Sequence, residues 1–187
     1  MKLSTCLLIC HGSLALLIAL ASPVTRAGAI ARQFSAGYDG VSWGISLAEL
    51  VEIRPGGYHY FAVGEGDRDY TFSDEKALFG IPRNGMRTRY YLDDTASVVS
   101  AGVMFPYEQL HKLLGTMILS FGPYQRMVVK GISTYYFWPR DDGMSLVVRA
   151  TLDPSFGMLE MTITGPNIDL EKRTRPECAH SAMHDKK

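Results

Sequence analysis

The chain has 187 residues, 47% of them apolar, and its 19 basic and 19 acidic side chains give a formal net charge of zero at pH 7. This length and composition are typical of a globular protein with one folded domain. The balanced charge is not the electrostatic footprint of a nucleic-acid binder, and it does not favour binding to an anionic membrane surface.

Residues 1–29 have the order of a secretory signal peptide. Lys2 supplies a positive charge, residues 7–20 form a largely apolar run, and small residues then follow in the A-x-A spacing of a cleavage site. Cleavage after Ala21 and cleavage after Ala29 both fit this pattern. We therefore expect the protein to be exported and to work in the periplasm or in the medium.

A membrane anchor is the alternative interpretation of this segment. A spanning helix needs about 20 predominantly apolar residues, whereas this run is shorter and contains His11 and Gly12. Cys6 and Cys10 lie inside the apolar run, too early for the lipidated cysteine of a lipoprotein. We expect no transmembrane segment in the mature chain.

The rest of the chain divides into three parts by composition. We predict a Gly- and Ala-rich lead-in over 30–40, a single folded domain over 41–166 and a flexible, polar tail over 167–187. Cys178 is the one cysteine outside the signal peptide, so we expect no internal disulfide.

The first half of the domain is predicted to begin with a short helix. Ser46 and Glu49 have the spacing of a capping box, and Leu47, Leu50 and Val51 share one apolar face. Aromatic and β-branched segments between turn residues then predict strands at 58–63, 68–72, 86–92 and 96–105.

The second half is predicted to begin with a longer helix from Pro106 to Phe121. Its apolar residues recur every three or four positions, and Gly122-Pro123 ends it. The following segments predict strands at 127–132, 133–138, 145–152 and 156–164, with a bulge at Gly131.

This order of elements predicts the fold class. Two main helices, each followed by strands with hairpin-length turns, indicate an α+β fold with antiparallel sheet. The shared order also leaves open two diverged helix-plus-strands repeats, 41–105 and 106–166.

Two short motifs resemble those of small exported bacterial envelope domains. The first is Trp43-Gly44-Ile45-Ser46 with Glu49, and the second runs from Tyr107 through Leu110 and Leu114 to Phe121-Gly122-Pro123. In these motifs the chain is similar to the BamE family of outer-membrane-assembly lipoproteins, whose short helices pack on a three-stranded antiparallel sheet. The resemblance implies an envelope scaffold or binding domain without a catalytic centre.

The familiar catalytic motifs do not occur in the chain. The strings nearest to G-x-S-x-G, around Ser46 and Ser145, lack the closing glycine, and no H-E-x-x-H, P-loop or G-x-G-x-x-G string is present. Acidic pairs such as Asp141-Asp142 lie in predicted turns. We predict no catalytic residue and no cofactor. An enzyme that assembles a cleft from His59 or His111 and a carboxylate is the alternative.

One group of residues has metal-ligating chemistry. Cys178, His180 and His184 offer a thiolate and two imidazoles, which suit zinc or copper. They lie in the polar tail, where nothing in the sequence would order them, so we predict no metal.

The candidate ligand-binding residues are four consecutive aromatic residues and two arginines. Alternation along a strand sends two of the four rings to each face of the sheet. The arginines form a local basic cluster on another predicted strand. The alternative is that the rings fill the core and that the arginines are solvated. The candidates are Tyr135, Tyr136, Phe137, Trp138, Arg87 and Arg89.

The sequence therefore predicts an exported, non-enzymatic binding or scaffold domain of the bacterial cell envelope or secretome. Its expected partner is a protein or an envelope component, and an aromatic platform would suit a sugar, a peptide or a lipid chain. A secreted enzyme that acts on glycan or peptide and a secreted effector or inhibitor are alternatives that the sequence leaves open.

Overall fold

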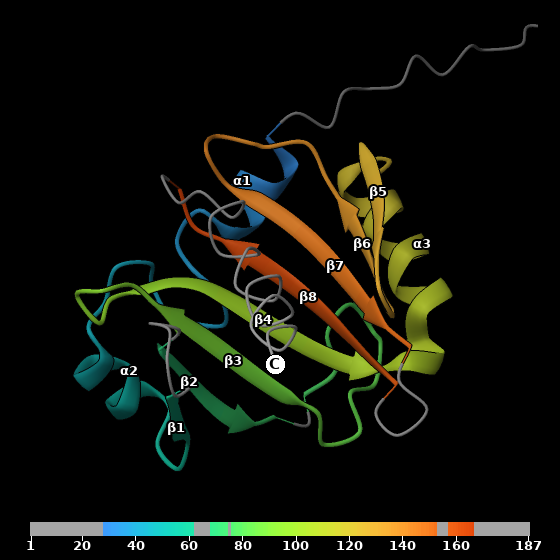
Figure 1. Ribbon diagram of the computed structural model, residues 1–187. Helices are drawn as coiled ribbons and strands as arrows, with labels where there is room; N and C mark the ends of the chain where they lie inside the picture. Colours follow the sequence, from blue (N-terminus) through green and yellow to red (C-terminus); the bar gives the residue numbers. More distant parts are fainter. Residues whose placement is uncertain (1–27, 62–67, 75, 153–156, 167–187) are drawn as a thin grey trace, which may run out of the picture.

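The computed structural model describes residues 28–61, 68–74, 76–152 and 157–166. The described part is mostly sheet, with three α-helices and one short 3₁₀-helix, so the expected α+β class holds in outline (Figure 1). The elements are α1 (Ala29–Phe34), α2 (Leu47–Ile53), β1 (Tyr58–Phe61), β2 (Arg68–Ser73), β3 (Arg87–Leu92), β4 (Val98–Pro106), η1 (Tyr107–Gln109), α3 (Leu110–Phe121), β5 (Arg126–Lys130), β6 (Ser133–Phe137), β7 (Ser145–Thr151) and β8 (Met158–Thr164).

Several expectations concern residues outside this part. The predicted signal peptide lies outside it except for its last two residues, and the predicted flexible tail over 167–187 lies wholly outside it. Among the helices that the structure describes, none has the length and apolar character needed to cross a membrane.

The eight strands form one antiparallel sheet in the order β1-β2-β3-β4-β8-β7-β6-β5. Each half is a four-stranded meander that follows a helix, α2 in the first half and α3 in the second (Figure 1). The halves join where β4 pairs with β8, from Ser100↔Thr164 to Pro106↔Met158. The two central strands of the sheet are therefore the last strand of each half.

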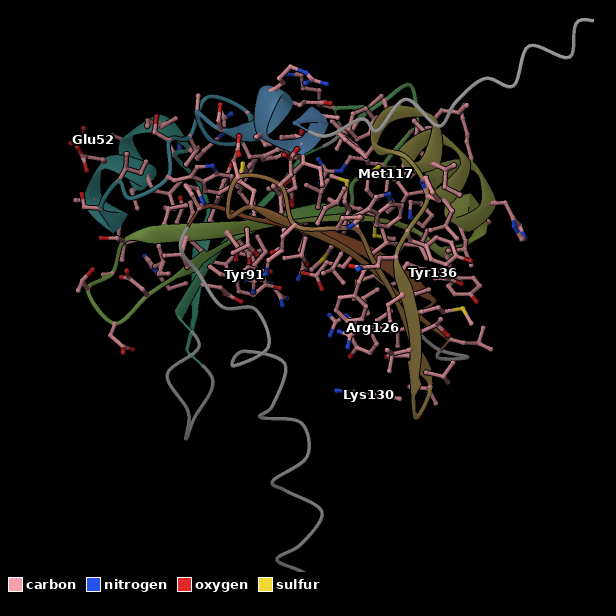
Figure 2. All side chains as sticks on the ribbon, turned by 90° about the horizontal axis from the view of Figure 1, so that it is seen from above. Glu52, Tyr91, Met117, Arg126, Lys130 and Tyr136 are labelled. Atoms are coloured by element: carbon pink, nitrogen blue, oxygen red, sulfur yellow. The ribbon has the colours of Figure 1, made fainter. Side chains whose placement is uncertain are left out.

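The three helices all lie on one face of the sheet, and both ends of the sheet bend away from them (Figure 2). Met117 of α3 lies between the helices and the sheet, where it packs in the core with Leu159, Met161 and Ile163 of β8. We call the opposite side the helix-free face. A row across it, through paired residues of successive strands from β1 to β5, is Tyr58, Thr71, Arg89, Gly102, Thr162, Val147, Phe137 and Arg126.

The start of α2 forms as its sequence predicts. The Ser46 side chain accepts a hydrogen bond from the Glu49 backbone N–H, and the Glu49 carboxylate accepts one from the Ser46 backbone N–H. This reciprocal pair satisfies donors that the first turn would otherwise leave unmet. The second main helix differs slightly from expectation, because Pro106 ends β4 and a 3₁₀ turn precedes α3.

Residues 30–40, expected as a lead-in, contribute to the core. Ile30, Ala31 and Phe34 of α1 are buried against the rest of the core. Asp141, in the loop between β6 and β7, accepts hydrogen bonds of 2.8 Å from the N–H groups of Gly28 and Ile30 and 3.1 Å from that of Ala31. A carboxylate at a helix N-terminus satisfies its unpaired donors, so a distant loop fixes α1.

Gly131 does not form the expected bulge. It occupies the first position of a two-residue turn between β5 and β6, with a φ of 55°, and Ile132 is the second residue. Glycine adopts this left-handed conformation without the penalty that a Cβ would add, and such turns match the twist of the flanking strands.

Candidate functional site

The centre of the helix-free face is a cluster of polar side chains from three strands. Glu160 of β8, only 3% exposed, accepts a 2.5 Å hydrogen bond from the hydroxyl of Tyr91 on β3. Its second oxygen forms a 2.6 Å ion pair with Arg149 of β7. Gly102 of β4 lies beside the carboxylate, and a Cβ at this position would be 2.3 Å from Glu160 Oε1. Glycine at this point of β4 therefore leaves the space that the carboxylate occupies.

Arg89 extends this cluster toward the first half of the sheet. Its Nε lies 3.1 Å from a carboxylate oxygen of Asp69, and its guanidinium lies 5.9 Å from the centre of the Tyr91 ring. Burial alone would lower the pKa of Arg89, but Tyr91, Glu160 and Asp69 outweigh that effect and raise it. Arg89 therefore stays charged although it is partly buried.

Tyr91 stays protonated in this environment. Burial raises the pKa of its phenol above the ordinary value near 10, and the carboxylate of Glu160 raises that pKa further. The Tyr91 hydroxyl therefore acts as a hydrogen-bond donor, and it is not a phenolate base or nucleophile at neutral pH.

Aromatic rings with arginines over them lie at both ends of the helix-free face. At the β5–β6 end, the rings of Tyr135 and Phe137 stack with centres 6.2 Å apart, and the Arg126 guanidinium lies 4.4 Å from the Phe137 ring centre. At the β1–β3 end, Arg87 lies 5.5 Å from the ring centre of Tyr58. Each pair combines a flat apolar surface with a positive charge.

The structure divides the predicted candidates between the two faces of the sheet. Four of them share the helix-free face, since register places Tyr135 opposite Arg149 and Phe137 opposite Val147, and places Arg87 and Arg89 on alternate positions of β3. The other two, Tyr136 and Trp138, lie on the helix side.

Trp138 and Tyr136 pack on the helix side, near the C-terminal end of α3. Trp138 is 3% exposed, and its indole Nε1–H donates a 2.8 Å hydrogen bond to the carbonyl of Gly122 at the end of α3. Tyr124 contacts both rings edge-on, with centres 5.2 Å from Tyr136 and 6.0 Å from Trp138. These contacts give the two residues a structural role.

Arg149, Glu160 and Arg126 were not among the predicted site residues. Arg149 and Glu160 are the charged residues of two otherwise apolar or hydroxyl-bearing strands. That contrast was a signal in the sequence, because an isolated charge on a central strand is rarely buried unless it is paired. Glu160 reaches Tyr91 only because β4 pairs with β8. No local sequence pattern specifies that pairing.

Two buried hydroxyls of the helix-free face have no hydrogen-bond partner in the described part of the chain. They are the Oγ of Ser145 and the Oγ1 of Thr164, which lie opposite each other in β7 and β8. Both oxygens are fully buried within the sheet.

Neither histidine of the enzyme alternative borders the cavity that the structure describes. His59 and His111 are both exposed, His59 beside the ring of Tyr70 and His111 on the outer side of α3. A cavity of about 200 Å³ lies on the helix side, lined in part by Phe34, Asp39 and Asp74, and neither histidine borders it.

The predicted metal candidates Cys178, His180 and His184 lie outside the described residues. Within the ranges that the structure covers, no group of three or more His, Cys, Asp or Glu residues is arranged to hold a metal ion.

A scan of protein-family models, a search of curated proteins and a search of solved structures each returned no match for this chain. The resemblance to the BamE family therefore stays a hypothesis. The residues of the helix-free face are the basis for the function proposed below.

Proposed function

We propose that the chain is an exported, non-enzymatic binding domain that holds an acidic glycan of the cell envelope or its surroundings on the helix-free face. The supporting observation is an uneven distribution of charge and rings. The described strands place five basic and two acidic side chains on this face, although the whole chain has equal numbers of each. The basic residues are Arg87, Arg89, Arg126, Lys130 and Arg149, and the acidic ones are Asp69 and Glu160.

The rings beside these cations favour a ligand that has both an apolar face and a negative charge. A guanidinium pairs with carboxylate or phosphate groups through two parallel N–H donors. Arg126 and Arg87 lie over the rings of Phe137 and Tyr58, so a ligand that reaches either guanidinium also meets apolar ring atoms beside it. A sugar ring with a carboxylate matches both properties at once.

A binding role fits the central cluster better than a catalytic role does. Glu160 is engaged by Tyr91 and Arg149, and the phenol of Tyr91 is held protonated. Neither group is available for proton transfer to a ligand, so the cluster serves as a rigid base for the surrounding side chains.

We also infer that the two halves of the sheet are diverged copies of one helix-plus-four-strands unit. The repeated order of α2 with β1–β4 and α3 with β5–β8 supports this inference. Each copy then supplies one end of the proposed surface, with Arg87 over Tyr58 in one half and Arg126 over Phe137 in the other.

The test is titration calorimetry with polygalacturonate, an anionic polysaccharide, against neutral dextran. We expect the full chain to bind polygalacturonate and not dextran, with affinity that falls as salt is added. Phe137→Ala and Arg126→Gln should each weaken binding, because one removes the ring and the other the charge. Lys112→Gln on the helix side is the matched control for loss of a cation, and it should have no effect.

Two results would contradict the proposal. One is equal binding of polygalacturonate and dextran. The other is binding of polygalacturonate that Lys112→Gln weakens as much as Arg126→Gln does, because that pattern indicates unspecific charge attraction. Polyglutamate serves as a further probe, and if it displaces bound polygalacturonate from the face at equal affinity, the glycan assignment is wrong.

A further inference from the structure

The last strand of the sheet, β5, is an open edge. In the sheet order β5 comes after β6 and has no neighbour on its other side among the described strands. Its register with β6 runs from Arg126↔Phe137 to Lys130↔Ser133. An edge of this kind presents unpaired backbone groups that can pair with another strand.

The hairpin determines which backbone groups point outward. In a two-residue hairpin the pair that flanks the turn, here Lys130 and Ser133, exchanges hydrogen bonds, and hydrogen-bonded pairs alternate along the strands. The N–H and C=O groups of Met127 and Val129 therefore point away from β6. An added strand would make its hydrogen bonds with these two residues.

The side chains of β5 on the helix side are unusually exposed for apolar residues. Met127 is 53% exposed and Val129 is 64% exposed. Ile132, in the turn, is 61% exposed, and Leu152, whose N–H donates to the Ile132 carbonyl, is 62% exposed. Exposed apolar residues on the helix side therefore follow the open edge and its turn, as in interaction surfaces.

The other side of the edge is positively charged. Arg126 and Lys130 are both exposed, and both project from β5 on the helix-free face (Figure 2). Antiparallel pairing of β5 with β5 of a second copy, centred on Val128, would place Arg126 of each chain opposite Lys130 of the other. Like charges directly opposite each other destabilise a strand pair, so this edge disfavours a second copy in that register.

We propose that β5 binds an extended acidic segment of another polypeptide as a ninth, antiparallel strand. The segment has acidic residues four positions apart, opposite Lys130 and Arg126, and apolar residues opposite Val129 and Met127. Main-chain hydrogen bonds supply affinity in this mode, and alternate side chains supply specificity. The inference goes beyond the proposed glycan site, since it concerns the backbone edge of β5 and a different class of partner, although Arg126 and Lys130 belong to both surfaces.

The probe is a capped nine-residue peptide, Thr-Ser-Glu-Val-Thr-Val-Glu-Ser-Thr, added to the ¹⁵N-labelled full chain. We expect the largest amide shifts at Met127 and Val129. The peptide with both Glu replaced by Lys should bind about 1.4- to fivefold more weakly for each pair, the range of an exposed ion pair. The permuted sequence Thr-Ser-Val-Glu-Thr-Glu-Val-Ser-Thr should bind weakly, because its acids lie opposite the apolar residues.

Backbone pairing is tested without altering the protein. The two Val residues of the probe direct their N–H groups at β5, whereas the N–H of the Thr between them points away. Methylating both Val nitrogens should therefore abolish binding, and methylating the nitrogen of that central Thr should leave it unchanged. On the protein, Val129→Pro should remove binding while Val129→Thr preserves it, since proline is tolerated where an edge N–H faces solvent.

Several outcomes would overturn the proposal. These are equal binding of the acidic and basic peptides, equal effects of the two methylations, or amide shifts confined to other strands. Concentration-dependent dimerisation that Val129→Pro abolishes would show that a second copy is the true occupant. The glycan proposal is separate, because loss of peptide binding in Val129→Pro should leave polygalacturonate binding intact.

Discussion

Replacing Gly102 by alanine tests whether the polar cluster at the centre of the helix-free face is rigid. The added Cβ would lie 2.3 Å from Glu160 Oε1 and 3.1 Å from Tyr91 Cε2, and the first distance is too short for any real contact. A carboxylate at the end of a free side chain would swing away at little cost. Here Tyr91 and Arg149 hold the two oxygens, so the overlap is relieved by breaking an interaction or by moving β4.

The size of the effect follows from two opposing contributions. Losing a hydrogen bond to a charged group costs about 1.5–3 kcal/mol, and overpacking a filled site costs about 1–3 kcal/mol. Both figures describe the same displacement of Glu160, so they are not additive. Removing the extra backbone freedom of glycine offsets about 0.5–1 kcal/mol. We expect Gly102→Ala to lower the free energy of unfolding by about 2 kcal/mol, or Tm by about 4–8 °C.

The assay is urea unfolding followed by far-UV circular dichroism, with Gly115→Ala as the matched control. Gly115 lies within α3 and has no atom within 4 Å of an added Cβ, so the same chemical change there should stabilise the protein by up to about 1 kcal/mol. In a Glu160→Ala background, Gly102→Ala should cost nothing further. If Gly102→Ala is as stable as Gly115→Ala, the idea of a rigid cluster is wrong.

Three further predictions follow from other contacts. Burial raises the pKa values of the phenols of Tyr38, Tyr90 and Tyr91 in the folded state, so stability should be full below about pH 10 and fall above it as the unfolded chain ionises. In denaturant titrations at several pH values, the Tyr91→Phe variant should lose less stability above about pH 10 than the unmodified protein does. Asp141→Ala should lower the free energy of unfolding by about 1–2 kcal/mol because it releases α1, and Asp141→Asn should lower it by less. The specific readout is faster amide hydrogen exchange in residues 30–34. Trp138→Ala should cost about 3–5 kcal/mol in chemical denaturation, whereas Trp138→Phe should fold and keep polygalacturonate affinity, which would separate structure from binding.

Local patterns predicted the elements of the fold well. The Ser46 capping box, the alternation in β3 and the apolar stripe of α3 each depend on neighbours within a few residues, and each forms as expected. α1 was missed because its short sequence carries no helix signal of its own and its N-terminus depends on Asp141, which lies more than a hundred residues away. The structure of such a segment is determined by its tertiary contacts rather than by propensity.

The candidate site was predictable only in its strand alternation. That alternation correctly separates Arg87 and Arg89 from the core positions of β3, but it does not show which of Tyr135 and Tyr136 faces the helices. The contact of Glu160 with Tyr91 joins residues that lie 69 positions apart. It arises because β4 pairs with β8, a choice set by the topology of the whole sheet.

The place of β4 in the sheet has a consequence for how the protein is made. All nine residues of β4 are buried in the finished fold, and one long side of this strand is completed by β8. A chain that emerges N-terminus first from a ribosome or a translocation channel exposes β4 while residues 107–157 are still to come. Throughout that interval this fully buried strand has an open side. Efficient production of this protein therefore depends on rapid delivery of its last strand, or on a chaperone that shields the first half until β8 arrives.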